Sequence, residues 1–472
     1  MKSMVWKALV SVIVAVVILI VPSPEGLKLT AWYYFALFAA VIVGLILEPI
    51  PIAALGLIGV ALAAALGLVE PKPGDAIRWG LAGFSNNTVW LIFGAFMFAM
   101  GYEKTGLGRR IALSLVKGLG GKTLGLGYAV ALADLALAPV TPSNTARTGG
   151  TIFPIVVNIP GLYGSQPGET GRKIGSYLMW TVFAASCITS SMFITALAPN
   201  VLAIVLVKKA VNLDISWPQW FIGFLPMGIA MLIAVPYLVY KIYPPEIKTS
   251  KEVPTWAAQE LTKMGKITPK EIGMALLIIL ALLLWIFGSK IIDATTVALV
   301  IIGLMVVVGI VKWEDILGNK PAWNVLVWTA TVVTLADGLN KVGFITWFAK
   351  VVSAFLMGMS PIVVMATLVA IFFFIHYMFA NITSHALAVL PVIIAAGAAL
   401  PGVPVKTFGM LLCYCLGIMG IITPYATGPA IVCYGTGYIP RRNFWTLGAI
   451  FGVIFLASLI FIEIPYLSFI NH

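Results

Sequence analysis

The stretch Thr-Pro-Ser-Asn-Thr at residues 141–145 interrupts one apolar segment, and Asn-Ile-Thr-Ser-His at residues 381–385 interrupts another. Lipid cannot satisfy exposed backbone groups, so irregular backbone at membrane depth persists only where protein buries it or where it lines a cavity. We therefore expect the two interrupted segments, residues 122–159 and 361–399, to turn back inside the membrane as re-entrant helical hairpins. The polar residues of each break would then form the hairpin tip.

The composition around these breaks places the whole chain in lipid. Hydrophobic residues make up 61% of the 472 residues and charged residues only 10%, and the mean hydropathy is +1.05. A soluble domain carries about 25% charged residues, so this chain has too few to cover a surface that faces water. At about 20 apolar residues per crossing, the length allows roughly ten to twelve spans. The sequence thus predicts an all-α polytopic membrane protein of the cell (inner) membrane.

The net charge of +12 comes from basic residues that lie between hydrophobic segments rather than on one polar face. This is the distribution of the positive-inside rule, so we expect the lipid bilayer as a partner, no nucleic acid, and a cytoplasmic N-terminus. The segments between spans that we expect on the cytoplasmic side, residues 102–122, 241–269 and 438–443, are rich in Lys and Arg. Those expected on the opposite side are residues 70–81, 201–216 and 340–360. Lys208 and Lys209 are the exception, on the opposite side.

The span count follows if neither hairpin crosses the membrane, which leaves eleven transmembrane helices. The first half is residues 1–245 with the hairpin 122–159, and the second half is residues 270–472 with the hairpin 361–399. Residues 246–269 are the cytoplasmic loop between them.

An internal repeat relates the two halves. Residues 101–107 resemble residues 338–344, an offset of 237 residues, and the same offset pairs Asn144 with Asn381. Five predicted crossings separate the two copies, and an odd number places them in opposite orientations. Inverted repeats with paired interruptions are typical of secondary transporters, whose binding site lies at the interruptions.

The first break has the chemistry of an anion site. Ser143 is a good helix N-cap, so the segment after it can present free backbone N–H groups and the positive end of a helix dipole to a carboxylate. Asn144 and Thr145 add neutral donors. The alternative is an ordinary capped turn between two helices. Arg147, about one turn further on, could neutralise substrate charge or hold nearby carbonyl groups.

The second break keeps an amide and hydroxyls and adds an ionisable residue. The candidate ligands are Asn381, Thr383, Ser384 and His385. An ionisable residue inside the membrane is by default a candidate for function. His376, in a strongly apolar run, is expected to be structural.

Two further breaks, residues 195–200 and 422–429, look like unwound stretches within spans. Their freed carbonyl groups could coordinate Na⁺. Thr423 and its neighbour Pro424 are additional candidates for contact with the substrate.

At these residues the chain resembles the divalent anion/sodium symporter family, over essentially its whole length. Residues 143–145 match that family's Ser-Asn-Thr hairpin signature, and residues 138–150 and 422–429 look closer still to its antiporter branch. That branch includes bacterial citrate/succinate antiporters, and plastid 2-oxoglutarate/malate translocators look similar. Residues 80–84, 175–180 and 417–420 add weaker support for the resemblance.

The resemblance implies eleven spans, two re-entrant hairpins, a homodimer and an elevator-like shift of a transport domain. It also implies that one substrate carboxylate meets residues 143–145 and the other meets the second hairpin tip. In sodium-coupled members the hairpin tips and unwound spans also hold Na⁺. The corresponding positions here are near Ser143, Asn144, Ala198 and Asn381.

The second tip departs from the symporters, which repeat Ser-Asn-Thr there. His385 could supply what a sodium ion supplies elsewhere, so we hypothesise an antiporter with no cofactor. Its expected substrates are succinate, malate, fumarate, tartrate, citrate and 2-oxoglutarate. The alternative with the same fold is a Na⁺-coupled dicarboxylate symporter. An intramembrane hydrolase is not expected, because the chain has neither a G-x-S-x-G nor an H-E-x-x-H motif, and paired hairpins suit a closed binding site better than a channel.

Overall fold

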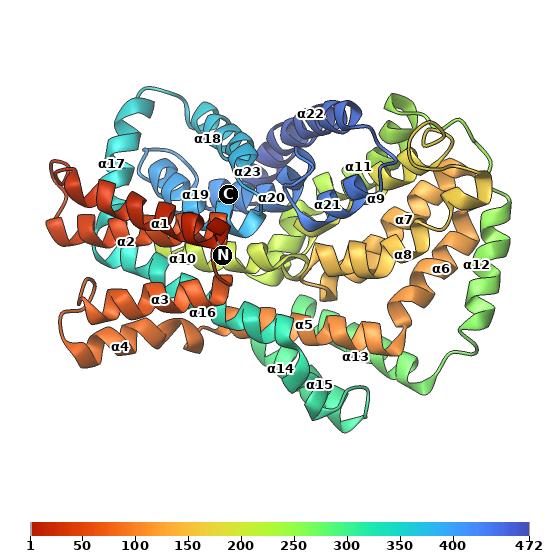
Figure 1. Cartoon of the computed structure of the whole chain (residues 1–472), viewed down its shortest axis with the longest axis horizontal. Helices are drawn as coiled ribbons and strands as arrows, with labels where there is room; N and C mark the ends of the chain where they lie inside the picture. Colours follow the sequence, from red (N-terminus) through yellow and green to blue (C-terminus); the bar gives the residue numbers. More distant parts are fainter. Residues whose placement is uncertain (1, 472) are drawn as a thin grey trace.

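The structure, a computed structural model, describes residues 2–471 and consists of helices (Figure 1). Outside the helices, these residues contain one isolated antiparallel bridge, between Lys122 and Thr249. The prediction of an all-helical chain is confirmed. Eight helical segments are long and apolar enough to cross a membrane, and six shorter apolar helices accompany them in the described part of the chain.

The first half contains the helices up to α11. In order they are α1 (Lys2–Ile20), α2 (Leu29–Leu47), α3 (Ile52–Ala65), α4 (Pro73–Leu81), α5 (Asn87–Thr105), α6 (Leu107–Leu119), α7 (Thr123–Leu137), η3 (Thr145–Ile152), α8 (Phe153–Val156), α9 (Gly175–Met192), α10 (Ala198–Val211) and α11 (Trp217–Ile242).

The second half begins at α13 after the connecting helix α12. In order these are α12 (Glu252–Lys263), α13 (Pro269–Phe287), α14 (Ala294–Val307), α15 (Trp313–Gly318), α16 (Lys320–Lys341), α17 (Phe344–Leu356), α18 (Pro361–Ile375), η6 (His376–Met378), α19 (Ile382–Ala398), α20 (Val405–Ile418), α21 (Gly428–Gly435), α22 (Arg441–Ser458), η8 (Leu459–Glu463) and α23 (Ile464–Ile470).

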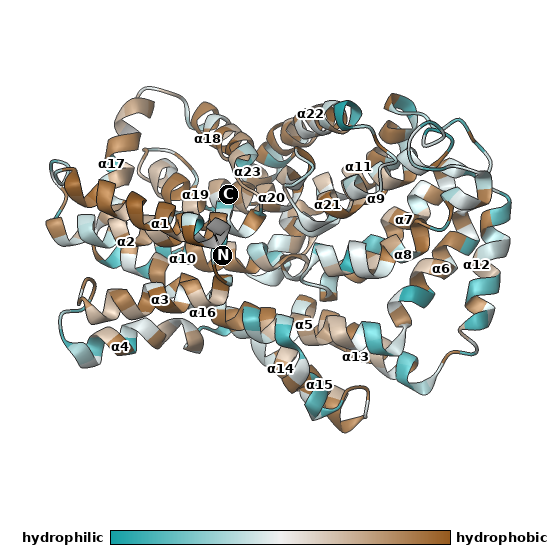
Figure 2. Cartoon of the chain, viewed as in Figure 1, coloured by the Kyte–Doolittle hydropathy of each residue, from teal (hydrophilic) through white to brown (hydrophobic). Residues whose placement is uncertain are grey.

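Large apolar side chains remain exposed along many of these helices, as expected where the surrounding solvent is lipid. Figure 2 shows the hydrophobic colouring over most of the bundle, whereas α12 and the ends of several helices are hydrophilic. Examples are Phe287 on α13, Val307 on α14 and Phe461 on η8, each at least three-quarters exposed. Such surface belongs in the bilayer rather than in water.

The internal repeat is visible in the joints that precede the two hairpins. Gly106 separates α5 from α6 with φ +76°, and Gly343 separates α16 from α17 with φ +85°. Glycine adopts this left-handed conformation without the steric penalty of a Cβ atom. The two joints lie 237 residues apart, the offset predicted from the sequence.

Four segments predicted as loops contain helices. Residues 70–81 include α4, residues 246–269 include α12, residues 340–360 include α17, and α10 continues through residues 201–211. We call residues 195–200 the third break and residues 422–429 the fourth. α10 begins at Ala198, within the third break, and Pro199 lies in its first turn, where a missing N–H group is tolerated. The other three are short helices that lack the length of a crossing.

Residues 247–250, just before α12, are hydrogen-bonded to the start of the first hairpin. Thr123 N donates to Lys248 O at 3.1 Å, and Ser250 N donates to Gly121 O at 3.2 Å. On the other side, Ile247 N donates to Lys173 O at 2.9 Å. α12 then lies along α6, at the right edge of Figure 1. The start of the hairpin and the approach to α9 are therefore held by the same strand-like segment.

Candidate functional site

The tip of the first hairpin follows an extended stretch after α7. Residues 141–143 are not helical, and η3 then continues as a π-helix into α8. Ser143 Oγ accepts a hydrogen bond from Ala146 N at 3.2 Å, as expected for a cap. Wide π-helical turns are frequent at functional sites because they change which side chains face a neighbour.

The tip is in contact with the segment that follows α20. Asn144 Nδ2 donates to Thr427 Oγ1 at 2.9 Å, and both side chains are buried. Gly428 lies so close to Thr145 that a Cβ atom on it would be 2.7 Å from the Thr145 Cβ. Only glycine therefore fits at position 428 without a shift, and the Ser-Asn-Thr tip is packed against the fourth break.

A buried ion pair joins the two arms of this hairpin. Arg147 Nε lies 3.1 Å from Asp134 Oδ2, and neither side chain is more than 2% exposed. The carboxylate also accepts hydrogen bonds from Thr148 Oγ1, at 3.2 Å, and from Thr189 Oγ1 on α9. Sequence reasoning missed Asp134, although a single carboxylate inside the apolar run 122–141 was the available signal.

The guanidinium group of Arg147 also binds the neighbouring backbone. Its Nη1 donates to Thr141 O at 3.1 Å and to Ala196 O at 2.9 Å, and its Nη2 donates to Ser190 Oγ at 3.1 Å. Of the two roles considered for Arg147, the structure supports the holding of carbonyl groups. Because the side chain is fully buried, it does not face an open site.

The third break, between α9 and α10, packs on the same hairpin. Ala198 N donates to Pro142 O at 2.7 Å, and Thr195 Oγ1 donates to Pro139 O. Asn200 Nδ2 bridges the carbonyl groups on the α9 side of the break, at 2.6 Å to Ser190 O. The unwound stretch is thus held by side chains and by hairpin 122–159.

The second hairpin tip is also capped. Asn381 Oδ1 accepts a hydrogen bond from Ser384 N at 2.8 Å, which starts α19. Ser384 Oγ donates to Leu45 O at the end of α2, at 3.4 Å. Thr383 is half-buried at the tip. The two tips therefore have similar local structure, but the second is attached to a helix near the N-terminus.

His385 lies beneath the second tip, among aromatic rings. Its ring centroid is 4.4 Å from that of Phe372, 5.0 Å from that of Phe379 and 5.1 Å from that of His376. The side chain is fully buried, and neither ring nitrogen has a hydrogen-bond partner in the described chain. His376 Nε2 is 3.3 Å from Ala426 O, so this residue, expected to be purely structural, contacts the fourth break.

In the fourth break, residues 422–429, the unwound part ends at residue 427 because α21 begins at Gly428. This unwound part lies between the two hairpins. One side contacts the first hairpin through Asn144 and Thr427, and the other contacts the second hairpin through His376 and Ala426. Thr423 is buried, and its hydroxyl group has no partner among the described residues; Pro424 is half-buried. The structure thus brings Asn144 to this unwound segment, which contains Thr423 and Pro424, whereas Ser384 at the second tip bonds to Leu45 instead. Thr427 is the contact that sequence reasoning did not single out.

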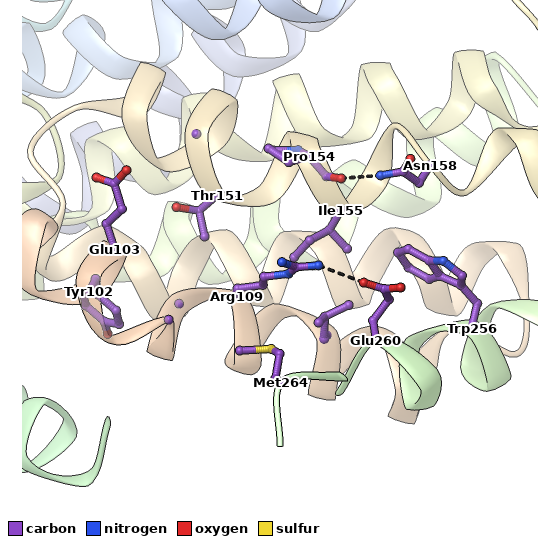
Figure 3. Close-up of a pocket in the computed structure, with 14 residues that line it drawn as sticks. Tyr102, Glu103, Arg109, Thr151, Pro154, Ile155, Asn158, Trp256, Glu260 and Met264 are labelled. Carbon is purple, nitrogen blue, oxygen red and sulfur yellow. Dashed lines mark hydrogen bonds and ion pairs between the residues drawn. The ribbon is translucent and has the colours of Figure 1, made fainter. Parts of the chain in front are cut away.

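A cavity of about 630 Å³ lies along the second arm of the first hairpin (Figure 3). Thr151 of η3, Pro154 of α8 and Asn158 in the turn after α8 line it. An ion pair of 2.8 Å between Arg109 and Glu260 crosses from α6 to α12. A hydrogen bond from Lys263 and the charge of Arg109 lower the pKa of Glu260, which keeps the pair ionised. The cavity reaches this hairpin from the side predicted to be cytoplasmic.

Comparison with known proteins identifies the family. Residues 2–470 match the family described as the sodium:sulfate symporter transmembrane region. The chain belongs to this family. This confirms the resemblance inferred from the hairpin motifs and makes the protein a multi-pass membrane transporter.

Similar members of the family are named antiporters. The chain is 48% identical to the citrate/succinate antiporter of Escherichia coli (strain K12) over 483 residues, which cover 100% of this chain and 99% of that protein. It is 48% identical to the L-tartrate/succinate antiporter of Shigella flexneri over 468 residues, 96% of each chain. These relatives are transporters, in agreement with the expectation that this family member is not an enzyme.

Two solved structures share the fold at low identity. The YdaH transporter of Alcanivorax borkumensis superposes with a TM-score of 0.56 at 16% identity, over 89% of this chain and 97% of that one. MtrF of Neisseria gonorrhoeae superposes with a TM-score of 0.53 at 13% identity, over 92% and 94%. At these low identities, the two structures support a similarity of fold and nothing more about this chain.

Proposed function

We propose that this transporter exchanges one di- or tricarboxylate for another across the cell inner membrane. The observation that carries the proposal is the position of the tip 143–145 against the fourth break, with Asn144 bound to Thr427. The names of the relatives supply the substrate class, since they are antiporters of citrate, tartrate and succinate. Malate, fumarate and 2-oxoglutarate present two carboxylates in a similar way and belong to the proposed range.

Neutral donors would bind the first carboxylate. Ser143, Asn144 and Thr145 offer hydroxyl and amide groups at the start of η3, together with backbone N–H groups at a helix N-terminus. Neutral donors avoid a buried cation that would be left unpaired when the substrate leaves. We assign the second carboxylate to the tip at Asn381 and Thr383, with Thr423 and Pro424 between the tips.

The hydrogen bonds of Arg147 support exchange without sodium. Na⁺ would need oxygen ligands near the first hairpin, and the carbonyl groups of Thr141 and Ala196 already accept hydrogen bonds from this guanidinium group. Pro142 O accepts a further hydrogen bond from Ala198 N. Each of these carbonyl groups thus has one protein donor, which supports exchange without Na⁺. Asn200 Oδ1 in the adjoining break has no partner in the described chain, so the Na⁺-coupled symporter is retained as the alternative that the test decides.

We also propose the remaining features of the family. These are eleven crossings, a cytoplasmic N-terminus, a homodimer, and an elevator-like movement in which the hairpins move with the broken helices. The hydrogen bonds that join hairpin 122–159 to the third and fourth breaks support a common moving body. Cross-linking of engineered cysteine pairs, one cysteine on hairpin 122–159 and one on a helix that does not move with it, would test the movement. Mass photometry of the detergent-solubilised protein would test the dimer.

The decisive experiment is counterflow in proteoliposomes. Vesicles loaded with unlabelled succinate should take up labelled citrate, tartrate or succinate without Na⁺, whereas empty vesicles should not. Uptake into empty vesicles that appears only with a sodium gradient would show that the protein is a symporter and not an exchanger. Uptake that does not saturate would indicate a channel.

Substitution at the tip connects the assay to the site. Asn144→Ala removes the donor to Thr427 and should lower exchange at least tenfold. Asn158→Ala is the matched control on the same hairpin, since Asn158 is exposed and bonds only the carbonyl of Pro154 one turn earlier. Equal activity of the two variants would remove Asn144 from the proposed site.

A further inference from the structure

A buried carboxyl group lies outside the site described above. Glu463 ends η8, within the last helical segment of the chain, and it is fully buried. The segment Leu459–Glu463 is a π-helix, and Pro465 follows in the first turn of α23. A π-helical turn inside a long α-helix is a local irregularity that often accompanies function. None of the contacts around the hairpin tips involves this residue.

The carboxyl group has a single hydrogen-bond donor. Glu463 Oε1 accepts from Met227 N of α11 at 3.0 Å, and Oε2 has no partner in the described chain. Met227 directly follows Pro226 near the middle of the 26-residue helix α11. The group therefore lies well inside the membrane.

The two phenol groups near Glu463 donate their hydrogen bonds to backbone carbonyl groups rather than to its carboxyl group. Tyr414 on α20 donates to Trp220 O at 2.9 Å, and Tyr466 on α23 donates to Ile222 O at 3.2 Å. Two free buried thiols, Cys413 and Cys415, flank Tyr414 on α20, and neither is a hydrogen-bond partner of Glu463. The remaining ionisable groups of the packed helices lie at least eight residues along their helix from these contacts: Tyr237, Tyr240 and Lys241 on α11, Lys406 on α20, and Arg441 and Arg442 on α22. Within the described residues, no salt bridge reaches Glu463.

An ionised carboxylate does not fit these surroundings. It has two acceptor oxygens and about four lone-pair positions, and it needs donors or a cation for most of them when it is removed from water. Here one backbone N–H group is available. A buried acid in this position takes up a proton and becomes neutral.

We propose that Glu463 is a proton-binding site at the contact of α11 with the last helical segment. The proton comes from bulk water, forms the O–H bond of a neutral carboxylic acid, and returns to water when the site ionises. The packing described here requires the protonated form. Ionisation at alkaline pH would draw water or a cation into the contact and separate α11 from η8. This inference concerns the helix contact and does not depend on the identity of the transported anion.

Infrared spectroscopy of the full chain in nanodiscs tests the proposal directly. With glutamate labelled by ¹³C, the wild-type protein should show a protonated carboxyl band near neutral pH that shifts in D₂O and disappears on alkaline titration. Glu463→Gln should lack this band, and the control Glu169→Gln, at an exposed loop position, should retain it. A wild-type spectrum without a protonated glutamate band overturns the proposal, whether or not the variant folds.

Stability gives a second, independent measurement. Glu463→Gln imitates the neutral acid, so it should fold and should lose the decrease in melting temperature that the wild-type protein shows as the pH rises. That decrease should begin near the pKa of a glutamate in an unfolded chain, about 4.3, and should end where the folded protein also releases the proton. Removal of Glu169 should leave that decrease unchanged. If Glu463→Gln and the wild-type protein show the same decrease, Glu463 is not the group that titrates.

Discussion

Replacement of Asp134 by Asn tests how the first hairpin is held together. In the folded protein the Asp134 carboxylate accepts from Arg147, Thr148 and Thr189, and it is 2% exposed. The amide of Asn has nearly the same shape but no charge, and one of its two acceptor oxygens is replaced by a donor. The substitution therefore leaves a fully buried guanidinium group without its counterion.

The expected loss follows from the burial of the pair. Removal of one partner from a buried ion pair destabilises a protein by about 3–5 kcal/mol, because the other charge stays buried and unpaired. Four neutral acceptors remain around Arg147, at Thr141 O, Ala196 O and the hydroxyl groups of Thr189 and Ser190. We therefore expect a value near the lower limit, about 3 kcal/mol.

Reversible unfolding in bicelles by steric trapping would measure this free energy. Asp75→Asn is the control, because its pair with Arg78 is highly exposed and an exposed pair contributes little. In a double-mutant cycle, the variant with both Asp134→Asn and Arg147→Gln should lose less unfolding free energy than the sum of the losses in the two single variants. A loss as small as that of the control would contradict the structural role assigned to this pair.

Two further predictions concern the tip and helix α12. Gly428→Ala should lower exchange at least tenfold, because its Cβ would displace Thr145, whereas Gly435→Ala, with open space around it, should leave exchange nearly unchanged in the proteoliposome assay. The pKa of Glu260 is lowered by its hydrogen bond from Lys263, so its contribution to holding α12 is present at neutral pH and is lost as the pH falls through that lowered value. The protection factors of the α12 amides, which correct for the intrinsic pH dependence of exchange, should therefore fall on acidification. Glu260→Gln should remove that pH dependence; an unchanged dependence in the variant would assign it to another group.

The polar breaks could be predicted because their signals are local. A polar break in an apolar segment and a capping side chain involve neighbouring residues. Ser143 forms the expected cap, and Asn381, predicted as a ligand, caps α19 in the same way. The offset between the repeats likewise needed only the sequence, and the glycine joints agree with it. The exchange function required more, since the composition of a tip does not separate an antiporter from a symporter.

The contacts that the sequence did not predict join distant residues. Asp134 meets Arg147 only because the hairpin turns back, and Asn144 meets Thr427 across 283 positions. The helix α17 was missed because the segment 340–360 is too short for a crossing. Tertiary packing decided these cases, and pattern reasoning has no access to it.

The buried ion pair of the first hairpin has no copy in the second half. At the offset of the repeat, Asp134 corresponds to Ile371 and Arg147 to Ser384. Only the first hairpin therefore has a buried ion pair at these positions, and residues of the second tip can change without leaving a buried charge unpaired. Evolution toward a new anion, natural or in the laboratory, is therefore expected to change residues 381–385 first and to leave the first hairpin as the conserved half of the pair.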